Sequence, residues 1–183
     1  GKQFFLHSVL ELDLGVNSNT RYFYGYNTQI DTTLLKDNIK QNFTNLGFSI
    51  GYNSTYTDSS HINYDLQAEG NHLNDNFNTT ENRLHFTGDF DKFVGDFHVG
   101  LDAGYTHINH QSQQDTLHNN LVKFSPWIAR YGDGWRVQGG INFFTDIVDG
   151  NGKPRLYPTA RMEYDMVDQY FIPYGGVDGK LTL

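Results

Sequence analysis

The segment DFHVGLDAGYT, residues 96–106, alternates polar or very small residues with apolar ones. A period of two is the pattern of a β-strand, whose successive side chains point to opposite faces. The same period recurs between turn-like clusters along the chain and predicts about ten strands. The expected strands are 3–15, 21–28, 41–54, 61–73, 82–92, 95–110, 119–131, 135–148, 154–166 and 170–181. The one competing helical pattern is a short turn at Leu34, Leu35 and Ile39.

One face of the strongest predicted strands carries no charged residue. In 154–166, for example, Leu156 and Met162 alternate with Arg161 and Glu163. The main members of the charge-free face are Phe97, Val99, Leu101, Tyr105, Trp135, Val137, Ile141, Phe143, Leu156, Met162 and Tyr164. The charged residues of the opposite face are Arg83, Asp89, His98, Asp102, Arg136, Asp146, Arg161, Glu163 and Asp165. The pattern therefore indicates a sheet with one side kept away from charge.

Alternation by itself does not say whether the charge-free face lines a core or meets lipid. Three features favour lipid. Several predicted strands run 12 to 16 residues, above the ~5–6 typical of globular proteins and enough to cross a bilayer at a tilt. The opposite face carries charges of both signs, which suit a wet lumen. Aromatic residues gather near strand ends, as in membrane barrels; they are Phe90 and Phe93, Tyr131 and Trp135, and Tyr164, Tyr170 and Phe171.

The charge-free set is accordingly predicted to face lipid, and the charged set to face the lumen. In a narrow barrel the charged set would plug the lumen with ion pairs. In a wider barrel it would act as a ring of fixed charges that selects solutes.

The predicted connections differ in length between the two ends of the strands. DKFVG, YGDGW and MVDQY are tight, and YGDGW contains the Asp-Gly pair of two-residue hairpins. The connection 28–40 and the segments LNDNFNTTE, NHQSQQDTLHNN and VDGNGKP are longer and polar. Short turns at one rim and long loops at the other are typical of outer-membrane barrels. NSTYTDSS is an exception, because it lies on the nominally short side.

Composition supports an ordered chain with little apolar core. Aromatic residues make up 15% of the 183 residues, yet hydrophobic residues reach only 37% and mean hydropathy is −0.58. A barrel with a polar interior and a thin apolar band has this mixture. The net charge is −8 and no Lys/Arg-rich run occurs, so nucleic-acid binding is not expected. The chain has no cysteine, which excludes disulfides and thiolate sites.

No residues stand out as a catalytic or metal site. The common hydrolase, metalloprotease and phosphate-loop motifs are absent, and nothing in the spacing of Ser125 and His85 selects them. His98 and His110 share a face but lie ~40 Å apart along a strand at ~3.3 Å per residue. We therefore expect no enzyme activity, no cofactor and no metal.

Three segments resemble the β-barrel outer-membrane proteins of Gram-negative bacteria, with the Tyr, Asn and Asp-rich texture of those from Bacteroidetes. They are HFTGDFDKFVGDFHVGLDAGYTHI, PWIARYGDGWRVQGGINFFTDI and RLYPTARMEYDMVDQYFIPYGGVDG. Each is a long strand, a tight turn and a returning strand. The resemblance implies an all-β, antiparallel up-and-down (meander) β-barrel of about ten strands, of the transmembrane type. The final residues Leu181–Leu183 lack the terminal aromatic common in such barrels, so residues 1–183 are either one barrel domain with an unusual last strand or a segment of a larger barrel.

The expected function is a non-catalytic role in the bacterial outer membrane, either porin-like or receptor-like transport or envelope structure. The expected partners are the lipid bilayer, small solutes and envelope proteins, and not nucleic acid. The alternative is a soluble β-barrel or sandwich, periplasmic or extracellular, that binds an apolar ligand in an aromatic core.

Overall fold

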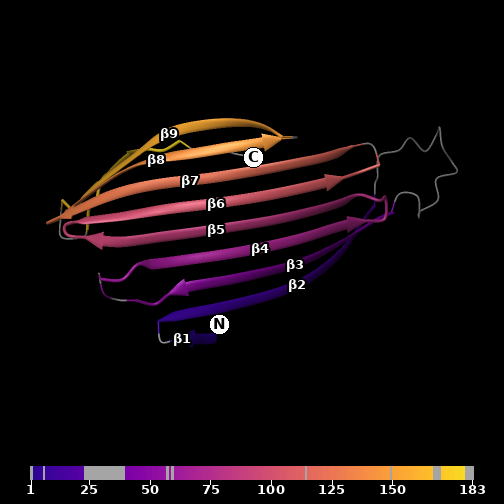
Figure 1. Cartoon of the computed structure of the whole chain (residues 1–183), viewed down its shortest axis with the longest axis horizontal. Helices are drawn as coiled ribbons and strands as arrows, with labels where there is room; N and C mark the ends of the chain where they lie inside the picture. The colour runs from indigo at the N-terminus through magenta and orange to yellow at the C-terminus, as the bar shows by residue number, and fades with distance from the viewer. Residues whose placement is uncertain are drawn as a thin grey trace.

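The computed structural model describes residues 2–5, 7–22, 40–56, 58, 60–113, 115–148, 150–166 and 170–179. They form a ten-stranded antiparallel sheet in which each strand lies beside its sequence neighbours, from β1 to β10 (Figure 1). The strands are β1 (Lys2–Phe5), β2 (Ser8–Tyr22), β3 (Lys40–Ser54), β4 (Asn63–Asp75), β5 (Thr80–Val94), β6 (Phe97–Gln111), β7 (Thr116–Gly132), β8 (Trp135–Val148), β9 (Asn151–Tyr164) and β10 (Tyr174–Val177). The predicted all-β, up-and-down meander is confirmed.

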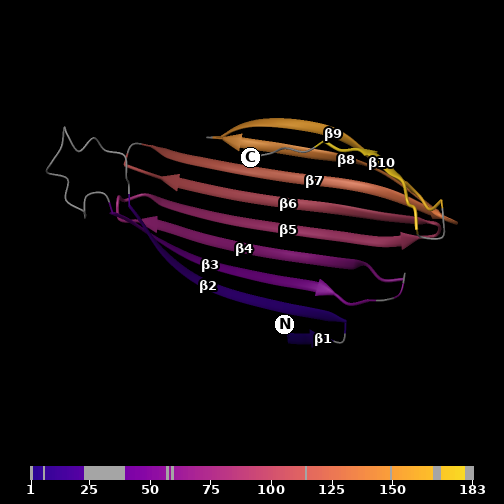
Figure 2. The same ribbon diagram turned by 180° about the vertical axis from the view of Figure 1, so that it is seen from behind.

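The strands β2 to β9 are long, at 13 to 17 residues each. Their pairing is regular, since β2 and β3 stay in register from Ser8 opposite Ser54 to Tyr22 opposite Lys40. The strands follow one another across the sheet in both views, with β1 at one side and β9 at the other (Figures 1 and 2). Within the described residues no backbone pairing joins β1 to β10, so the sheet has two edges.

Two hairpin turns follow directly from glycine. Val94 pairs with Phe97, and Gly95 between them has a φ of 61°, a left-handed value that glycine adopts without a Cβ clash. Gly132 pairs with Trp135, and Gly134 has a φ of 72°. Both tight turns were predicted from the sequence and are confirmed. The predicted turn in MVDQY includes 167–169, which lie outside the described residues. On either side of them, Met166 N–H donates to the Phe171 carbonyl at 3.0 Å.

Two predicted strand assignments are wrong at the ends of the sheet. The expected strand 3–15 is two strands, β1 and β2, joined at His7. The apolar alternation of 9–16 continues into the polar sequence NSNTRY, which pairs fully with β3. Of the expected strand 21–28, Arg21 and Tyr22 belong to β2, and 23–28 lies outside the described residues, as do Leu34, Leu35 and Ile39. Of the expected strand 170–181, the described residues 170–179 form one strand of four residues, β10.

The expected long loops are also wrong at three places. β4 and β5 are joined through 76–79, β6 and β7 through 112–115, and β8 and β9 through 149–150. The polar sequences around these turns are strand, because backbone pairing continues through them, for example from His110 to Leu117. Polar residues in these three segments do not indicate a loop, because they are compatible with a strand as well. The connection within 28–40 lies mostly outside the described residues.

The described chain has almost no apolar core. Among the described residues, only Ala129 and Phe144 are buried hydrophobic side chains. Both lie on the predicted polar face of the sheet, with buried Thr106 and Ser125. Burial thus falls on the face opposite the apolar one.

The turn between β4 and β5 depends on the carboxylate of Asp75. Its Oδ1 accepts hydrogen bonds from the backbone N–H groups of Phe77 at 2.9 Å and Thr79 at 2.8 Å, and its Oδ2 accepts one from Gln41 Nε2 at 2.6 Å. We expect Asp75→Ala to lower the free energy of unfolding by ~1.5–3 kcal/mol, because hydrogen bonds to a charged group are lost. Urea titration of refolded protein measures this. Asp96→Ala is the control, since Asp96 is 81% exposed and its nearest cation is 3.7 Å away; equal losses in the two variants would contradict the assignment.

Candidate functional site

The two predicted sets of side chains lie on opposite faces of the sheet. The cross-strand pairing shows that the residues predicted to face lipid all lie on one face of the sheet, which we call the outer face. The charged set lies on the other, the inner face, except for Asp165, which follows the end of β9. The outer face is open: Phe97 is 43% exposed, Ile141 48% and Met162 54%. The side of the sheet without charge is therefore not packed into a protein interior.

The apolar side chains of the outer face form a band that crosses the strands obliquely. On β2 the band runs from Leu10 to Val16, and on β9 from Leu156 to Tyr164. The ladder of paired residues links Leu10, at one limit of the band on β2, to Leu156, at the opposite limit on β9. The band thus shifts by roughly one residue per strand, and with a rise of ~3.3 Å and a spacing of ~4.8 Å this corresponds to strands tilted by ~35° to the band's normal.

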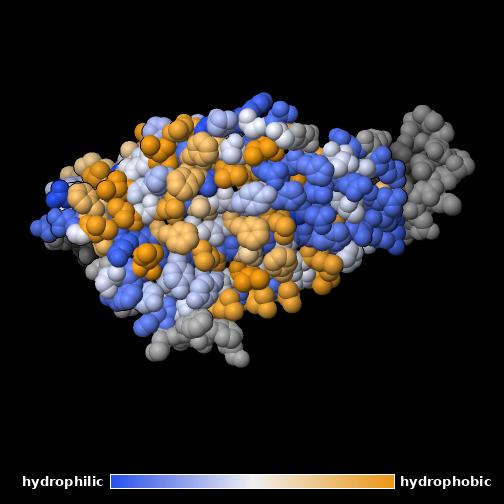
Figure 3. Space-filling model, in the orientation of Figure 1, coloured by the Kyte–Doolittle hydropathy of each residue, from blue (hydrophilic) through white to orange (hydrophobic). Residues whose placement is uncertain are grey.

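Beyond this band the strands continue with polar residues on both faces. Examples are 17–22 in β2, 71–75 in β4 and 107–111 in β6. Figure 3 shows hydrophilic side chains gathered at the end where β4 meets β5 and β6 meets β7, and apolar side chains over much of the rest of the visible face. The band therefore has a sharp polar border at one end of the sheet.

Within the apolar band, two described cations depart from the charge-free pattern of the outer face. Lys92 and Arg130 lie on this face, paired with Val99 and Phe97 respectively. Each is two residues from the end of its strand. The Arg130 guanidinium lies over the Phe97 ring at 5.5 Å. Both side chains are close enough to the turn end for their charges to reach out of the band.

The predicted aromatic clusters divide between the two faces. Trp135 and Tyr164 are cross-strand partners on the outer face. Phe93 and Tyr131 instead lie on the inner face, where both contact His98. The expectation that Phe93 and Tyr131 belong to an outer aromatic belt is therefore wrong, because their odd positions in β5 and β7 turn them inward.

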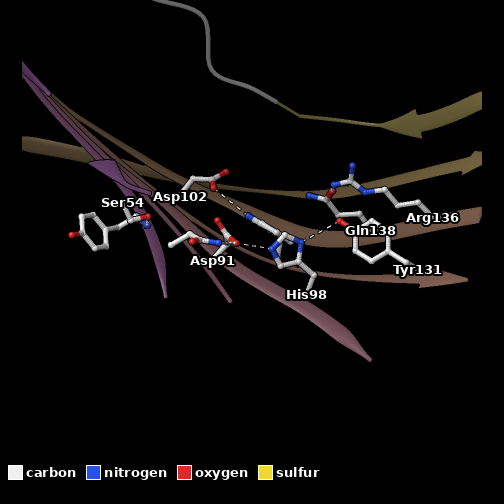
Figure 4. A network of polar contacts seen from close by, with 10 residues as sticks. Ser54, Asp91, His98, Asp102, Tyr131, Arg136 and Gln138 are labelled. Carbon is white, nitrogen blue, oxygen red and sulfur yellow. Dashed lines mark hydrogen bonds and ion pairs between the residues drawn. The ribbon is translucent and has the colours of Figure 1, made fainter. Parts of the chain in front are cut away.

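His98 lies at the centre of a polar network on the inner face (Figure 4). Its Nε2 is 2.7 Å from Asp91 Oδ2, and its Nδ1 is 3.1 Å from the Tyr131 hydroxyl. The ring stacks on Phe93 with centroids 4.2 Å apart. Asp102, on the same face, accepts from Trp127 Nε1 through Oδ1 at 3.2 Å. Arg161 and Glu163 form an ion pair at 2.7 Å.

Acidic side chains predominate on β4 to β6 of the inner face, and basic side chains on β7 to β9. Asp65, Asp89 and Asp102 are direct cross-strand partners in β4, β5 and β6. Most basic residues of this face lie on β7 to β9; they are Lys123, Arg136, Lys153, Arg155 and Arg161. Like charges placed directly opposite one another destabilise a sheet unless counter-charges lie near. The inner face therefore has a negative side and a positive side.

A cavity of about 690 Å³ opens where these two sides meet. Its lining includes Asp102 from the acidic side, Lys123 and Arg161 from the basic side, and the aromatic rings of Trp127 and Tyr174. Ser125 also lines it; this residue is only 3% exposed, and its hydroxyl has no hydrogen-bond partner. The cavity thus offers both charges, two rings and an unused polar group.

The sequence reasoning missed several residues of the inner face. Asp91 shares its parity with Asp89 and could have been assigned in the same way. Lys123, Trp127 and Tyr131 lie on β7, whose two faces are both mixed in character and therefore gave no clear alternation. From the sequence, Ser125 was a candidate only as a nucleophile. His85 is not its partner, because His85 Nδ1 lies 2.7 Å from the Thr106 hydroxyl.

The described residues contain neither a metal-binding cluster nor a helix that could span a membrane. No group of three or more His, Asp or Glu side chains is arranged to hold a metal ion in this part of the chain. No helix in the same residues is long and apolar enough to cross a membrane.

Comparison with known proteins gives one structural likeness. No family model matches the sequence, and no curated protein matches it. Among solved structures, the translocator domain of the autotransporter NalP from Neisseria meningitidis is similar at a TM-score of 0.46 and 10% identity. The likeness covers 95% of this chain and 70% of that one.

Close packing of Trp127 on Gly100 provides a test of the inner face. A Cβ at Gly100 would lie 2.2 Å from the Trp127 ring, whereas a Cβ at Gly104, on the same strand and face, would be 3.5 Å from its nearest neighbour. We expect Gly100→Ala to cost ~1–3 kcal/mol of unfolding free energy, because the indole must move, and Gly104→Ala to be close to neutral. Urea titration with tryptophan fluorescence compares the two. A neutral Gly100→Ala would show that Trp127 does not pack there.

Proposed function

We propose that this chain is a β-barrel of the bacterial outer membrane, or a segment of one, with a non-catalytic role in transport or envelope structure. The oblique, exposed apolar band of the outer face carries the proposal. In a water-soluble sheet an apolar face of this extent would be covered, because exposed apolar patches beyond a few hundred Å² are rare. In a bilayer the same face is solvated by hydrocarbon.

The dimensions of the band support a membrane. On β6 it runs from Phe97 to Tyr105, which is roughly 30 Å of strand and roughly 25 Å of depth at a tilt of ~35°. Outer-membrane barrels have an apolar band of about this height and strands tilted by about 35–45°. Because the strands are tilted to the membrane normal, the part of each strand that lies in the hydrocarbon shifts along the strand from one neighbour to the next. A shift of about one residue per strand is therefore expected for a membrane barrel.

The borders of the band support the same assignment. Trp135 and Tyr164 lie together on the outer face at the end of β8 and β9, where amphipathic rings would meet lipid headgroups. At the opposite border, the hydroxyl of Tyr105 donates to Asn120 Oδ1 at 2.8 Å. The polar strand ends beyond Tyr105 would project into water, on the side that carries long loops in such barrels.

The inner face suits a hydrated or ion-paired lumen. His98 with Asp91, and Arg161 with Glu163, show how its charges satisfy one another. Among the described residues no base is hydrogen-bonded to the Ser125 hydroxyl, which agrees with the proposed non-catalytic role. The charge segregation favours passage or binding of charged solutes over a merely structural plug. The likeness to Bacteroidetes proteins and the identity of any envelope partner stay predictions.

A barrel in lipid requires that the sheet edges be paired. Among the residues that the structure describes, Lys2 to Phe5 of β1 cover one edge of β2 and Tyr174 to Val177 of β10 cover the edge of β9, and the rest of each edge is uncovered. Unpaired backbone groups in hydrocarbon cost several kcal/mol each. We propose that the uncovered lengths of β2 and β9 are paired in the membrane, either with each other or with further strands.

The soluble alternative has less support. It requires the aromatic residues to form a dry core that holds an apolar ligand. In the part of the chain that is described, the large apolar side chains of the outer face are instead exposed, including Leu14 at 78% and Leu156 at 63%. A second sheet or layer covering them is not found among the described residues.

Gel mobility tests barrel formation. We expect protein refolded into detergent or vesicles to migrate faster before boiling than after it, because a continuous ladder of backbone hydrogen bonds resists unfolding by detergent. A variant with Gly140→Pro, which removes one ladder donor in β8, is expected to lose the shift. Purification without detergent as a monodisperse species with identical mobility before and after boiling would contradict the proposal.

Arginine substitution tests which face meets lipid. Leu101 and Ile141 lie near the middle of the band on β6 and β8. We expect Leu101→Arg and Ile141→Arg each to cost ~2–4 kcal/mol when the protein folds into vesicles, as arginine does at the bilayer midplane. Asn109→Arg is the control on the same face of β6 but beyond the band, with an expected cost of ~0–1 kcal/mol. Equal costs at the three positions, measured by urea titration in vesicles, would refute the assigned orientation.

A further inference from the structure

We infer that the cavity between the acidic and basic sides of the inner face binds short peptides with free termini, a class of zwitterion. The inference rests on the proposed function, in which this face lines a water-accessible lumen. Its chemical basis is the juxtaposition of Asp102 with Lys123 and Arg161 around one cavity of about 690 Å³, a volume within the range of small-molecule sites.

The amino terminus of the peptide is recognised by the acidic side. Asp102 accepts from Trp127 through Oδ1, which fixes the carboxylate in the cavity lining, where it would attract an ammonium group. Asp89 is its direct cross-strand neighbour and Asp65 the next one along. A bound cation therefore offsets the repulsion within this row, so a free amino terminus is attracted more strongly than a neutral one.

The carboxyl terminus is recognised by the basic side. Arg161 lines the cavity while pairing with Glu163 through Nη2, and its guanidinium has further N–H donors. Its side chain is 59% exposed, so these donors are accessible to a ligand. Lys123 lies on the other side of the Asp102 row from Arg161, since its partner on β6 is Gly104 whereas the ladder from Arg161 leads to His98. It adds a second positive charge to the cavity.

The distance between the two sides selects the length of the ligand. Asp102 is on β6 and Arg161 on β9, three strand spacings apart, and the ladder places Arg161 in the row of His98, four residues from Asp102. The two residues are therefore up to ~20 Å apart along the sheet, at ~4.8 Å per strand and ~3.3 Å per residue. A single amino acid has its two charges too close together to engage both sides. An extended tripeptide spans ~10 Å at ~3.3 Å per residue, and the reach of the two side chains covers the remainder.

The middle of the peptide is held by polar and aromatic groups. Ser125 is buried, lines the cavity and has no hydrogen-bond partner, so a peptide N–H or C=O that displaces the side chains over its hydroxyl would satisfy it. Trp127 and Tyr174 supply ring surface on the same wall. These groups contact any peptide, whereas the charged groups distinguish the state of its termini.

Four forms of trialanine test the inference: free termini, an acetylated amino terminus, an amidated carboxyl terminus, and both blocked. Binding is followed by Trp127 fluorescence in a Trp135→Phe background, which leaves one tryptophan, using protein whose heat-modifiable gel mobility shows that it is folded. We expect free trialanine to bind at least tenfold more tightly than either singly blocked form, with the doubly blocked form weakest.

The variants assign each terminus to its side. Asp102→Asn is expected to abolish the preference for a free amino terminus, and Lys123→Gln or Arg161→Gln to reduce the preference for a free carboxylate at least fivefold. Ser125→Ala is expected to weaken all four peptides alike. Lys153→Gln, on the inner face of β9 but outside the cavity, is the charge-matched control and is expected to change nothing.

Three outcomes overturn the inference while leaving the barrel intact. The first is equal binding of the four peptides, and the second is no binding to protein that shows heat-modifiable mobility. Preference for the free peptide that survives Asp102→Asn, Lys123→Gln and Arg161→Gln would also overturn it, because the charges would then act elsewhere. Loss of heat-modifiable mobility in the unmodified protein would contradict the proposed function instead.

Discussion

The structure depends on a ladder of backbone hydrogen bonds that joins each strand to the next from β1 to β10. Away from the two sheet edges, long strands paired over most of their length satisfy the majority of peptide groups, with a break at Ser125 and Pro126 opposite β8. This matters more than usual here, because side-chain burial among the described residues is slight and includes only two buried hydrophobic residues. In hydrocarbon such pairing becomes obligatory, since no water replaces a lost partner. The apolar outer face can then be left open without loss of the fold.

The alternation of side chains along each strand gives the sheet both its apolar outer face and its charged inner face. Because each strand turns alternate side chains to opposite faces, a single register distributes apolar residues outward and ionisable residues inward. The oblique course of the band and the segregation of charge on the inner face both follow from that register. Each is seen along a different row of cross-strand partners. Leu10 and Leu156 belong to one row at opposite limits of the band, while Asp65, Asp89 and Asp102 belong to another.

The sequence predicted the face of a residue better than the end of a strand. Facing depends on parity alone, so Leu101, Ile141, Asp102 and Arg161 could be assigned to their faces without knowing the register. The limits of β2 and the lengths of the connections could not, because polar residues such as those in NHQSQQDTLHNN pair as well in a strand as they serve in a loop. The cavity at Ser125 could not be predicted either, since it depends on how β6 to β10 curve toward one another, and the partner of His98 depended on register between β5 and β6.

The polar strand ends beyond the apolar band have a practical consequence. On β6 and β7 the paired region continues past Tyr105 as far as the turn around Ser112 and Asp115. If the band marks the hydrocarbon, this rigid ribbon lifts the turn roughly 15 Å clear of it. A short epitope inserted between Ser112 and Asp115 would therefore be displayed away from the membrane surface, on a platform that does not itself need lipid to hold its shape.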